Sequence, residues 1–146
     1  KIIQHCLPHQ NQELSSFYKE SNIEHELFNF SDNLVEFFSK VNLAITRSGS
    51  SMLAELTNAN IPFISIPLPS SVDDHQLKNA TFYKNKNFSF LVEEKDLNDK
   101  LFNLLKEIFE NMSKLDKISA NQRQYSDKHV YENIDKVLDK ILNEKN

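Results

Sequence analysis

The stretch Leu43-Ala44-Ile45-Thr46-Arg47-Ser48-Gly49-Ser50-Ser51, followed by a helical pattern over residues 52–59, indicates the fold of this chain. Gly49 is the one glycine among 146 residues. The apolar run before it predicts a buried strand, and the pattern after it predicts a helix. A glycine at such a junction suggests a backbone position that tolerates no Cβ. Turns of this kind direct free N–H groups at an anion, so we expect ligand binding to centre here.

The same alternation of short apolar runs and amphipathic stretches continues along the chain. The predicted strands are residues 1–6, 25–30, 43–46, 63–66 and 88–92, and the predicted helices are residues 11–21, 33–40, 51–59, 74–86 and 97–111. We expect Ser31 or Asp32 to cap the second helix and Asp96 the fifth. This order predicts an α/β fold with one parallel sheet and right-handed crossovers. Ligands bind such sheets at the carboxyl ends of the strands.

Two closing helices are predicted over residues 114–125 and 131–142. The second carries an apolar stripe formed by Ile134, Val137, Leu138, Ile141 and Leu142. A stripe of this spacing ordinarily faces the core of its own domain, and a stripe that faces a partner is the alternative.

Composition narrows the function. The formal net charge of −4 argues against nucleic acid as a partner. Cys6 is the lone cysteine, which rules out an internal disulfide and fits a reducing compartment. No apolar run approaches the length of about 20 residues that spans a bilayer. The start lacks both a signal-peptide pattern and an initiator methionine, so we interpret the chain as one incomplete domain, residues 1–146, of something longer.

The turn around Gly49 has the residues of a nucleotide site. Ser50 and Ser51 stand at the predicted helix start, where the helix dipole favours an anion. Glu55 follows Ser51 by four residues and shares its helical face. A carboxylate one turn from a phosphate suits two neighbouring hydroxyls, as on a ribose. The alternative is that a serine caps the helix and Glu55 is merely solvated.

A second group of polar residues begins the helix predicted over residues 74–86. Gln76 and Asn79 are three residues apart, so both amides share one face near the helix start. Amides offer a donor and an acceptor together, which suits sugar hydroxyls. The alternative is a capping Asp73 or Asp74 with a surface His75. A metal site is disfavoured, because these three adjacent residues point in different directions.

These motifs resemble the C-terminal half of the MurG-type N-acetylglucosaminyltransferases of glycosyltransferase family 28. The resemblance rests on Arg47-Ser48-Gly49-Ser50-Ser51-Met52-Leu53-Ala54-Glu55-Leu56, on Ile61-Pro62 and Ile66-Pro67, and on Asp74-His75-Gln76-Leu77-Lys78-Asn79-Ala80. It implies a Rossmann-like domain that forms the donor-binding half of a GT-B enzyme. By this resemblance the turn from Gly49 through Ser50, Ser51 and Met52 holds the UDP diphosphate, and Glu55 binds the ribose. Gln76 and Asn79 bind the N-acetylglucosamine, and the backbone of Ser31 binds the uracil.

The resemblance also implies what this half lacks. The family's first strand, Gly-rich loop and N-terminal acceptor domain precede the matched region, and the catalytic-base candidate lies with them. Met52 stands where a threonine is common, and Gln4-His5-Cys6-Leu7 departs from the family's pattern. We therefore assign no catalytic residue, metal or cofactor to this chain and expect it to be inactive alone.

The implied reaction is an inverting transfer of N-acetylglucosamine from UDP to a lipid-linked muramoyl pentapeptide (lipid I to lipid II) in peptidoglycan synthesis. The implied location is the inner face of the bacterial cell membrane, with the bilayer and the lipid acceptor contacted through the absent domain. Two alternatives remain open: the chain belongs to another GT-B nucleotide-sugar transferase, or it is a non-catalytic UDP-sugar-binding subunit that works with a partner chain.

Overall fold

The computed structural model describes residues 1–125 and 130–143, and for residues 130–134 it describes the backbone alone. The described residues divide into two compact units, Lys1–Val41 and the part that follows from Asn42. The first unit holds β1 (Ile2–His5), α1 (Asn11–Glu20), β2 (His25–Phe28) and the short α2 (Val35–Phe38). Its two strands are parallel, with Ile2 paired to His25 and His5 to Phe28.

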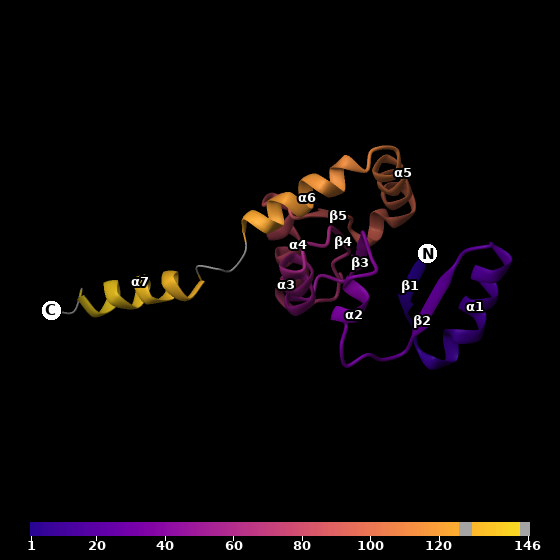
Figure 1. The fold of residues 1–146 in the computed structure, drawn as a ribbon, viewed down its shortest axis with the longest axis horizontal. Helices are drawn as coiled ribbons and strands as arrows, with labels where there is room; N and C mark the ends of the chain where they lie inside the picture. The colour runs from indigo at the N-terminus through magenta and orange to yellow at the C-terminus, as the bar shows by residue number, and fades with distance from the viewer. Residues whose placement is uncertain (126–129, 144–146) are drawn as a thin grey trace. The chain divides into compact units, whose positions relative to one another are not determined.

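The second unit is built on a three-stranded parallel sheet with the order β3-β4-β5. Its strands are β3 (Ala44–Thr46), β4 (Phe63–Ser65) and β5 (Ser89–Leu91), connected through α3 (Ser50–Asn58) and α4 (His75–Asn85). A π-helical turn (Leu97–Leu101) then leads into α5 (Phe102–Glu110), α6 (Ser113–Gln124) and α7 (Val130–Asn143) (Figure 1). The predicted β-α-β-α order is confirmed.

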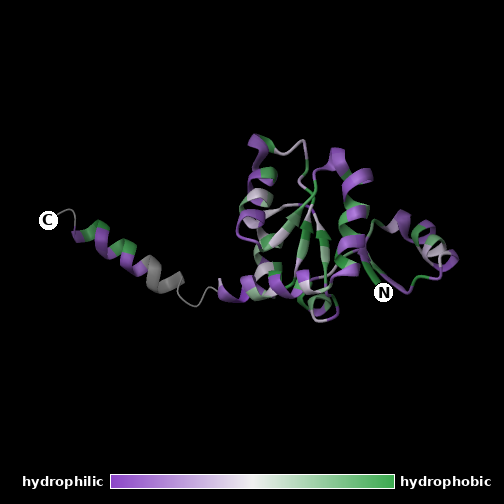
Figure 2. Ribbon diagram, turned by 90° about the horizontal axis from the view of Figure 1, so that it is seen from above, coloured by the Kyte–Doolittle hydropathy of each residue, from purple (hydrophilic) through white to green (hydrophobic). Residues whose placement is uncertain are grey.

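Apolar side chains of the second sheet form the core of that unit. Ile64 on β4 and Ile108 on α5 are fully buried and cluster with Val92 and Leu115. In Figure 2 the strands of this sheet lie between helices whose outward surfaces are largely hydrophilic. The three residues of β4 are all buried, as expected for a central parallel strand that is covered on both faces.

The strands form two parallel sheets, β1-β2 in the first unit and β3-β4-β5 in the second. Two expectations about helix caps are wrong. Neither Ser31 nor Asp32 caps α2: Ser31 Oγ accepts the Asn33 N–H at 3.1 Å, which lies before the helix, and Leu34 is the N-cap. Asp96 likewise makes no capping bond, because its carboxylate pairs with Lys100 at 2.7 Å.

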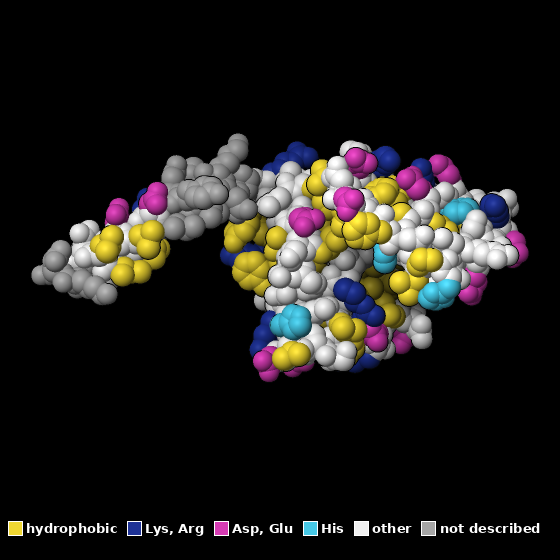
Figure 3. Space-filling model, turned by 90° about the horizontal axis from the view of Figure 1, so that it is seen from below, with side chains coloured by type: hydrophobic (Ala, Val, Ile, Leu, Met, Phe, Trp, Pro, Cys, Tyr) yellow, Lys and Arg dark blue, Asp and Glu magenta, His cyan; other side chains and the backbone are white. Residues whose placement is uncertain are grey.

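The apolar stripe of α7 does not reach the core. Val137 is 59% exposed, Leu142 is 65% exposed, and Leu138 and Ile141 are about half exposed. The side chain of Ile134 lies outside those that the structure describes. Figure 3 shows hydrophobic side chains grouped on this helix. The expectation of a core-facing stripe is thus wrong for the four described residues, since these side chains remain open to solvent.

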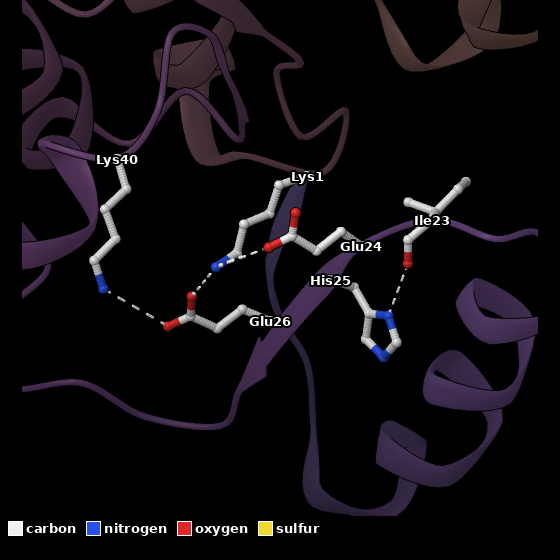
Figure 4. A network of polar contacts seen from close by, with 6 residues as sticks. All are labelled: Lys1, Ile23, Glu24, His25, Glu26 and Lys40. Atoms are coloured by element: carbon white, nitrogen blue, oxygen red, sulfur yellow. Dashed lines mark hydrogen bonds and ion pairs between the residues drawn. The ribbon is translucent and has the colours of Figure 1, made fainter.

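A network of charges links the two strands of the first unit (Figure 4). Lys1 Nζ lies 2.9 Å from Glu26 and 3.6 Å from Glu24, and Lys40 approaches Glu26 from α2's side at 3.9 Å. The hydrogen bond from Lys1 lowers the pKa of Glu26, and the same bond raises the pKa of Lys1. All four side chains are substantially exposed, so solvent screens these pairs.

Candidate functional site

The turn around Gly49 connects β3 to α3 in the second unit. Gly49 is the N-cap residue of α3, with φ −65° and ψ 135°. A Cβ built on it would meet no atom within 4 Å other than those of its two neighbours in the chain. The expectation that this position tolerates no Cβ is therefore wrong for the chain itself, because the backbone is ordinary and the space around it is open.

The start of α3 presents backbone donors. The Leu53 N–H bonds to the Gly49 carbonyl at 3.1 Å and closes the first turn of the helix. The N–H groups before it lack carbonyl partners inside a helix, and no side chain caps α3. The alternative in which Ser50 or Ser51 caps this helix is thus not seen. Both serines are exposed, and Met52 is half-buried.

Gln76 joins three segments through one oxygen atom. Its Oε1 accepts the backbone N–H of Ser48 at 3.1 Å and that of Leu68 at 3.0 Å. Ser48 belongs to the turn after β3, and Leu68 belongs to the loop after β4. The start of α4 therefore holds both loops at the carboxyl ends of these two parallel strands.

Asn79 completes this arrangement from the next turn of α4. Its Nδ2 donates to the Ser48 carbonyl at 3.1 Å, so Gln76 and Asn79 bind the N–H and the C=O of the same residue. We call Ser48, Gln76 and Asn79 the amide clasp. The prediction that the two amides share one face of the helix is confirmed by their common partner.

The clasp leaves one polar group free on each amide. No described residue bonds Gln76 Nε2, which is a donor, or Asn79 Oδ1, which is an acceptor. Ser48 is fully buried, and its Oγ has no partner in the described structure. The site therefore holds a free donor, a free acceptor and an unpaired hydroxyl near the start of α3.

Sequence reasoning missed the central role of Ser48. The sequence predicts ligand contacts for Gln76 and Asn79, whereas in the structure each of them binds the backbone of Ser48. The signal available in the sequence was the serine's place between β3 and Gly49, at the carboxyl end of a strand. Its burial and its two partners depend on contacts 28 and 31 residues away in the chain.

The segment before the clasp has an unusual backbone. Asp73 and Asp74 are consecutive residues with positive φ, 49° and 54°. Left-handed conformations of residues other than glycine store about 1–3 kcal/mol each and concentrate at functional sites. Neither aspartate caps α4 with its side chain. His75 is exposed, and its Nδ1 lies 2.8 Å from the Val72 carbonyl.

Glu55 and Arg47 lie on either side of the turn in the sequence. Glu55 is exposed on α3, one helical turn after Ser51. Arg47 Nη1 lies 2.5 Å from Glu94 Oε2. The role of Arg47, which the sequence left open, is thus partly structural: the guanidinium ties the turn after β3 to the segment after β5.

Ser31 belongs to the first unit, whereas the other predicted site residues belong to the second. Within the described residues, no group of three or more His, Cys, Asp or Glu side chains could hold a metal ion. None of the described helices is long and apolar enough to cross a membrane.

Known proteins resemble this chain over nearly its whole length. A transferase of Pelagibacter ubique (strain HTCC1062), named UDP-N-acetylglucosamine--N-acetylmuramyl-(pentapeptide) pyrophosphoryl-undecaprenol N-acetylglucosamine transferase, is 35% identical over 99% of this chain and 41% of its own length. The enzyme of the same name from Rickettsia massiliae (strain Mtu5) is 32% identical over 82% of this chain and 32% of its own length. The chain thus spans less than half the length of these curated relatives.

A solved structure has the same fold. The crystal structure of Acinetobacter baumannii MurG superposes with a TM-score of 0.75 over 92% of this chain and 42% of the other, at 24% identity. Residues 1–144 match the model of the glycosyltransferase family 28 C-terminal domain. With the parallel sheet and helices described above, this match shows that the chain belongs to the glycosyltransferase family 28 C-terminal domain family.

Proposed function

We propose that this chain is the donor-binding half of an inverting hexosyltransferase that moves N-acetylglucosamine from UDP-N-acetylglucosamine to an undecaprenyl-diphosphate-linked muramoyl pentapeptide. The observation that carries the proposal is the amide clasp beside the uncapped start of α3. The names of the curated relatives supply the substrates. Because the chain spans less than half of those relatives, the acceptor would be bound by residues outside it.

The diphosphate would bind at the turn from Gly49 to Met52. Helix starts bind phosphate because their N–H groups and dipole both favour an anion. The open space at Gly49 supports this placement, because an oxyanion needs room to approach the backbone. Ser50 and Ser51 would add hydroxyl contacts from their exposed positions.

The ribose and the sugar would be held on either side of that turn. Glu55 would accept hydrogen bonds from the two ribose hydroxyls, since its carboxylate is free of ion pairs in the described structure. Gln76 Nε2 would donate to one hydroxyl of N-acetylglucosamine, and Asn79 Oδ1 would accept from another. The backbone of Ser31 would bind the uracil edge.

In the transfer itself, the acceptor hydroxyl oxygen forms a bond to the anomeric carbon while the bond from that carbon to the diphosphate breaks. The leaving UDP takes the bonding electron pair, and the hydroxyl proton passes to a base outside this chain. The residues here stabilise the charge that develops on the diphosphate, which is a preorganised electrostatic contribution. The enzyme would act on a lipid-linked acceptor at the inner face of the cell membrane.

Calorimetric titration with UDP-N-acetylglucosamine, UDP-glucose and GDP-mannose tests the proposal. We expect the uridine donors to bind more tightly than GDP-mannose. Glu55→Ala should weaken UDP about tenfold, the worth of one charged hydrogen-bonding group. Glu20→Ala, at an exposed glutamate of α1, is the matched control and should leave binding unchanged. Equal affinity for uridine and guanosine donors would contradict the proposed donor.

A further inference from the structure

A cavity of about 680 Å³ lies in the second unit along β5, the edge strand of the sheet. Its walls come from the end of α4, from β5 and from the helices α5 and α6. None of Gly49, Glu55, Gln76 or Asn79 lines it. Ligand sites commonly have volumes of about 300–1,000 Å³, so the cavity is large enough for a small molecule.

The charge of the walls is one-sided. Lys84, Lys114 and Lys117 line the cavity, and no aspartate or glutamate does. Lys114 pairs with Glu107 outside the cavity, whereas Lys84 and Lys117 have no ion-pair partner in the described part of the chain. On a chain whose net charge is −4, this concentration of positive charge favours an anion.

Hydrogen bonds between elements fix the walls of the cavity. Asn121 Nδ2 on α6 donates to the Asn87 carbonyl at 3.2 Å. The buried Gln122 Nε2 donates to the carbonyls of Phe88 at 2.8 Å and Ile61 at 3.0 Å. These bonds fix α6 against the entry to β5, so a ligand would meet a largely preformed site.

The walls also offer a polar group and an apolar surface. Ser89 is 5% exposed, and its Oγ is buried without a partner in the described structure. Unpaired buried hydroxyls are uncommon, and a bound water or ion is one of their ordinary explanations. Leu104 and the buried Ile118 add apolar wall on the other side.

The end of α4 opposes an anion, because helix C-termini carry partial negative charge. Three of its last four carbonyls are occupied, however. The N–H groups of Lys86, Asn87 and Phe88 bond the carbonyls of Phe82, Lys84 and Tyr83 at 3.2, 2.9 and 3.0 Å. Lys114, in the first turn of α6, brings a favourable helix start to the same cavity.

We propose that this cavity is a second ligand site of the chain, which binds a small amphipathic anion: a phosphate or carboxylate joined to an apolar body. The lysines hold the charged head, and Leu104 and Ile118 contact the apolar body. Because the site is separate from the amide clasp, its occupancy does not depend on the donor proposed above.

NMR titration of the ¹⁵N-labelled chain with phenyl phosphate tests this proposal, with saturating UDP present to occupy the other anion site. We expect shifts at the amides of Ser89, Leu104 and Ile118 and an affinity of about 1 mM. Inorganic phosphate lacks the apolar body and benzyl alcohol lacks the charge, so each should bind about tenfold more weakly.

The double variant Lys84→Gln/Lys117→Gln should weaken phenyl phosphate about fivefold. Lys19→Gln/Lys100→Gln makes the same change in net charge away from the cavity and should leave the affinity unchanged. Ser89→Ala removes the unpaired hydroxyl, so it should keep the fold and reduce the affinity. Equal binding of the three probes, shifts that map elsewhere, or equal affinities of the two double variants would overturn the proposal.

Discussion

The amide clasp can be tested by two substitutions of Gln76. Gln76→Met keeps the length of the side chain but removes both Nε2 and the Oε1 that accepts the N–H groups of Ser48 and Leu68. Gln76→Glu keeps an accepting oxygen in the same place, and it replaces the Nε2 donor by a carboxylate oxygen. The two variants therefore separate the clasp from the free donor that would face a ligand.

The expected cost follows from burial. Ser48 is 0% exposed, so its N–H would lose its partner without gaining water, at about 1–3 kcal/mol. Leu68 is 37% exposed, so water can replace Gln76 there and the loss is about 0.5 kcal/mol. We expect Gln76→Met to lower the free energy of unfolding of the second unit by about 1.5–3.5 kcal/mol and Gln76→Glu by less than about 1 kcal/mol.

Urea unfolding followed by NMR resonances of the second unit measures these differences. Amide exchange at Ser48 adds a local readout, since its N–H loses its acceptor in the methionine variant alone. Gln124→Met, at an exposed glutamine of α6, is the control for the substitution itself. Equal stability of the Gln76→Met and Gln76→Glu variants, with unchanged exchange at Ser48, would refute the clasp.

Three further predictions concern other parts of the chain. Gly49→Ala should change the free energy of unfolding by less than about 0.5 kcal/mol, because φ is −65° and no atom beyond the chain neighbours lies within 4 Å of the new Cβ. Calorimetry should show that the same variant binds UDP about tenfold more weakly, because the new methyl group occupies the space through which the diphosphate reaches the backbone. Gln122→Met should lower stability to urea by about 1–3 kcal/mol, since it removes the buried Nε2 donor that the carbonyls of Ile61 and Phe88 share, and a loss below about 0.5 kcal/mol would contradict that role. Glu26 should titrate below its ordinary pKa of 4.5, so its stabilising contribution is present above pH 4.5 and is lost as pH falls through the lowered pKa. Lys1→Met should return the midpoint of the Glu26 titration, measured by NMR, towards 4.5, and an unchanged midpoint would argue against the ion pair.

The elements of the fold could be predicted because their signals are local. Apolar runs such as residues 63–66 and amphipathic stretches such as residues 74–86 identify strands and helices by period alone, and the structure has each of them within a few residues. The helix caps were wrong, because a capping bond depends on where the last turn begins. A shift of one or two residues, as at Asn33, redirects the side chain to another partner.

The fate of the apolar stripe on α7 shows the same limit. Its period correctly predicts a helix, and Val130–Asn143 is helical. Period cannot say what covers the apolar face, since burial depends on packing between segments. The four described residues of that stripe are exposed.

By itself the sequence determined the β-α-β-α order, the turn at Gly49 and the shared face of Gln76 and Asn79, because each depends on residues close together in the chain. Only the tertiary structure decided that both amides bind Ser48, that Gly49 has open space around it and that Arg47 pairs with Glu94. These contacts join residues about 30 to 50 positions apart. Parallel strands require crossovers that bring such distant loops to one edge of the sheet, and no local pattern records which atoms then meet.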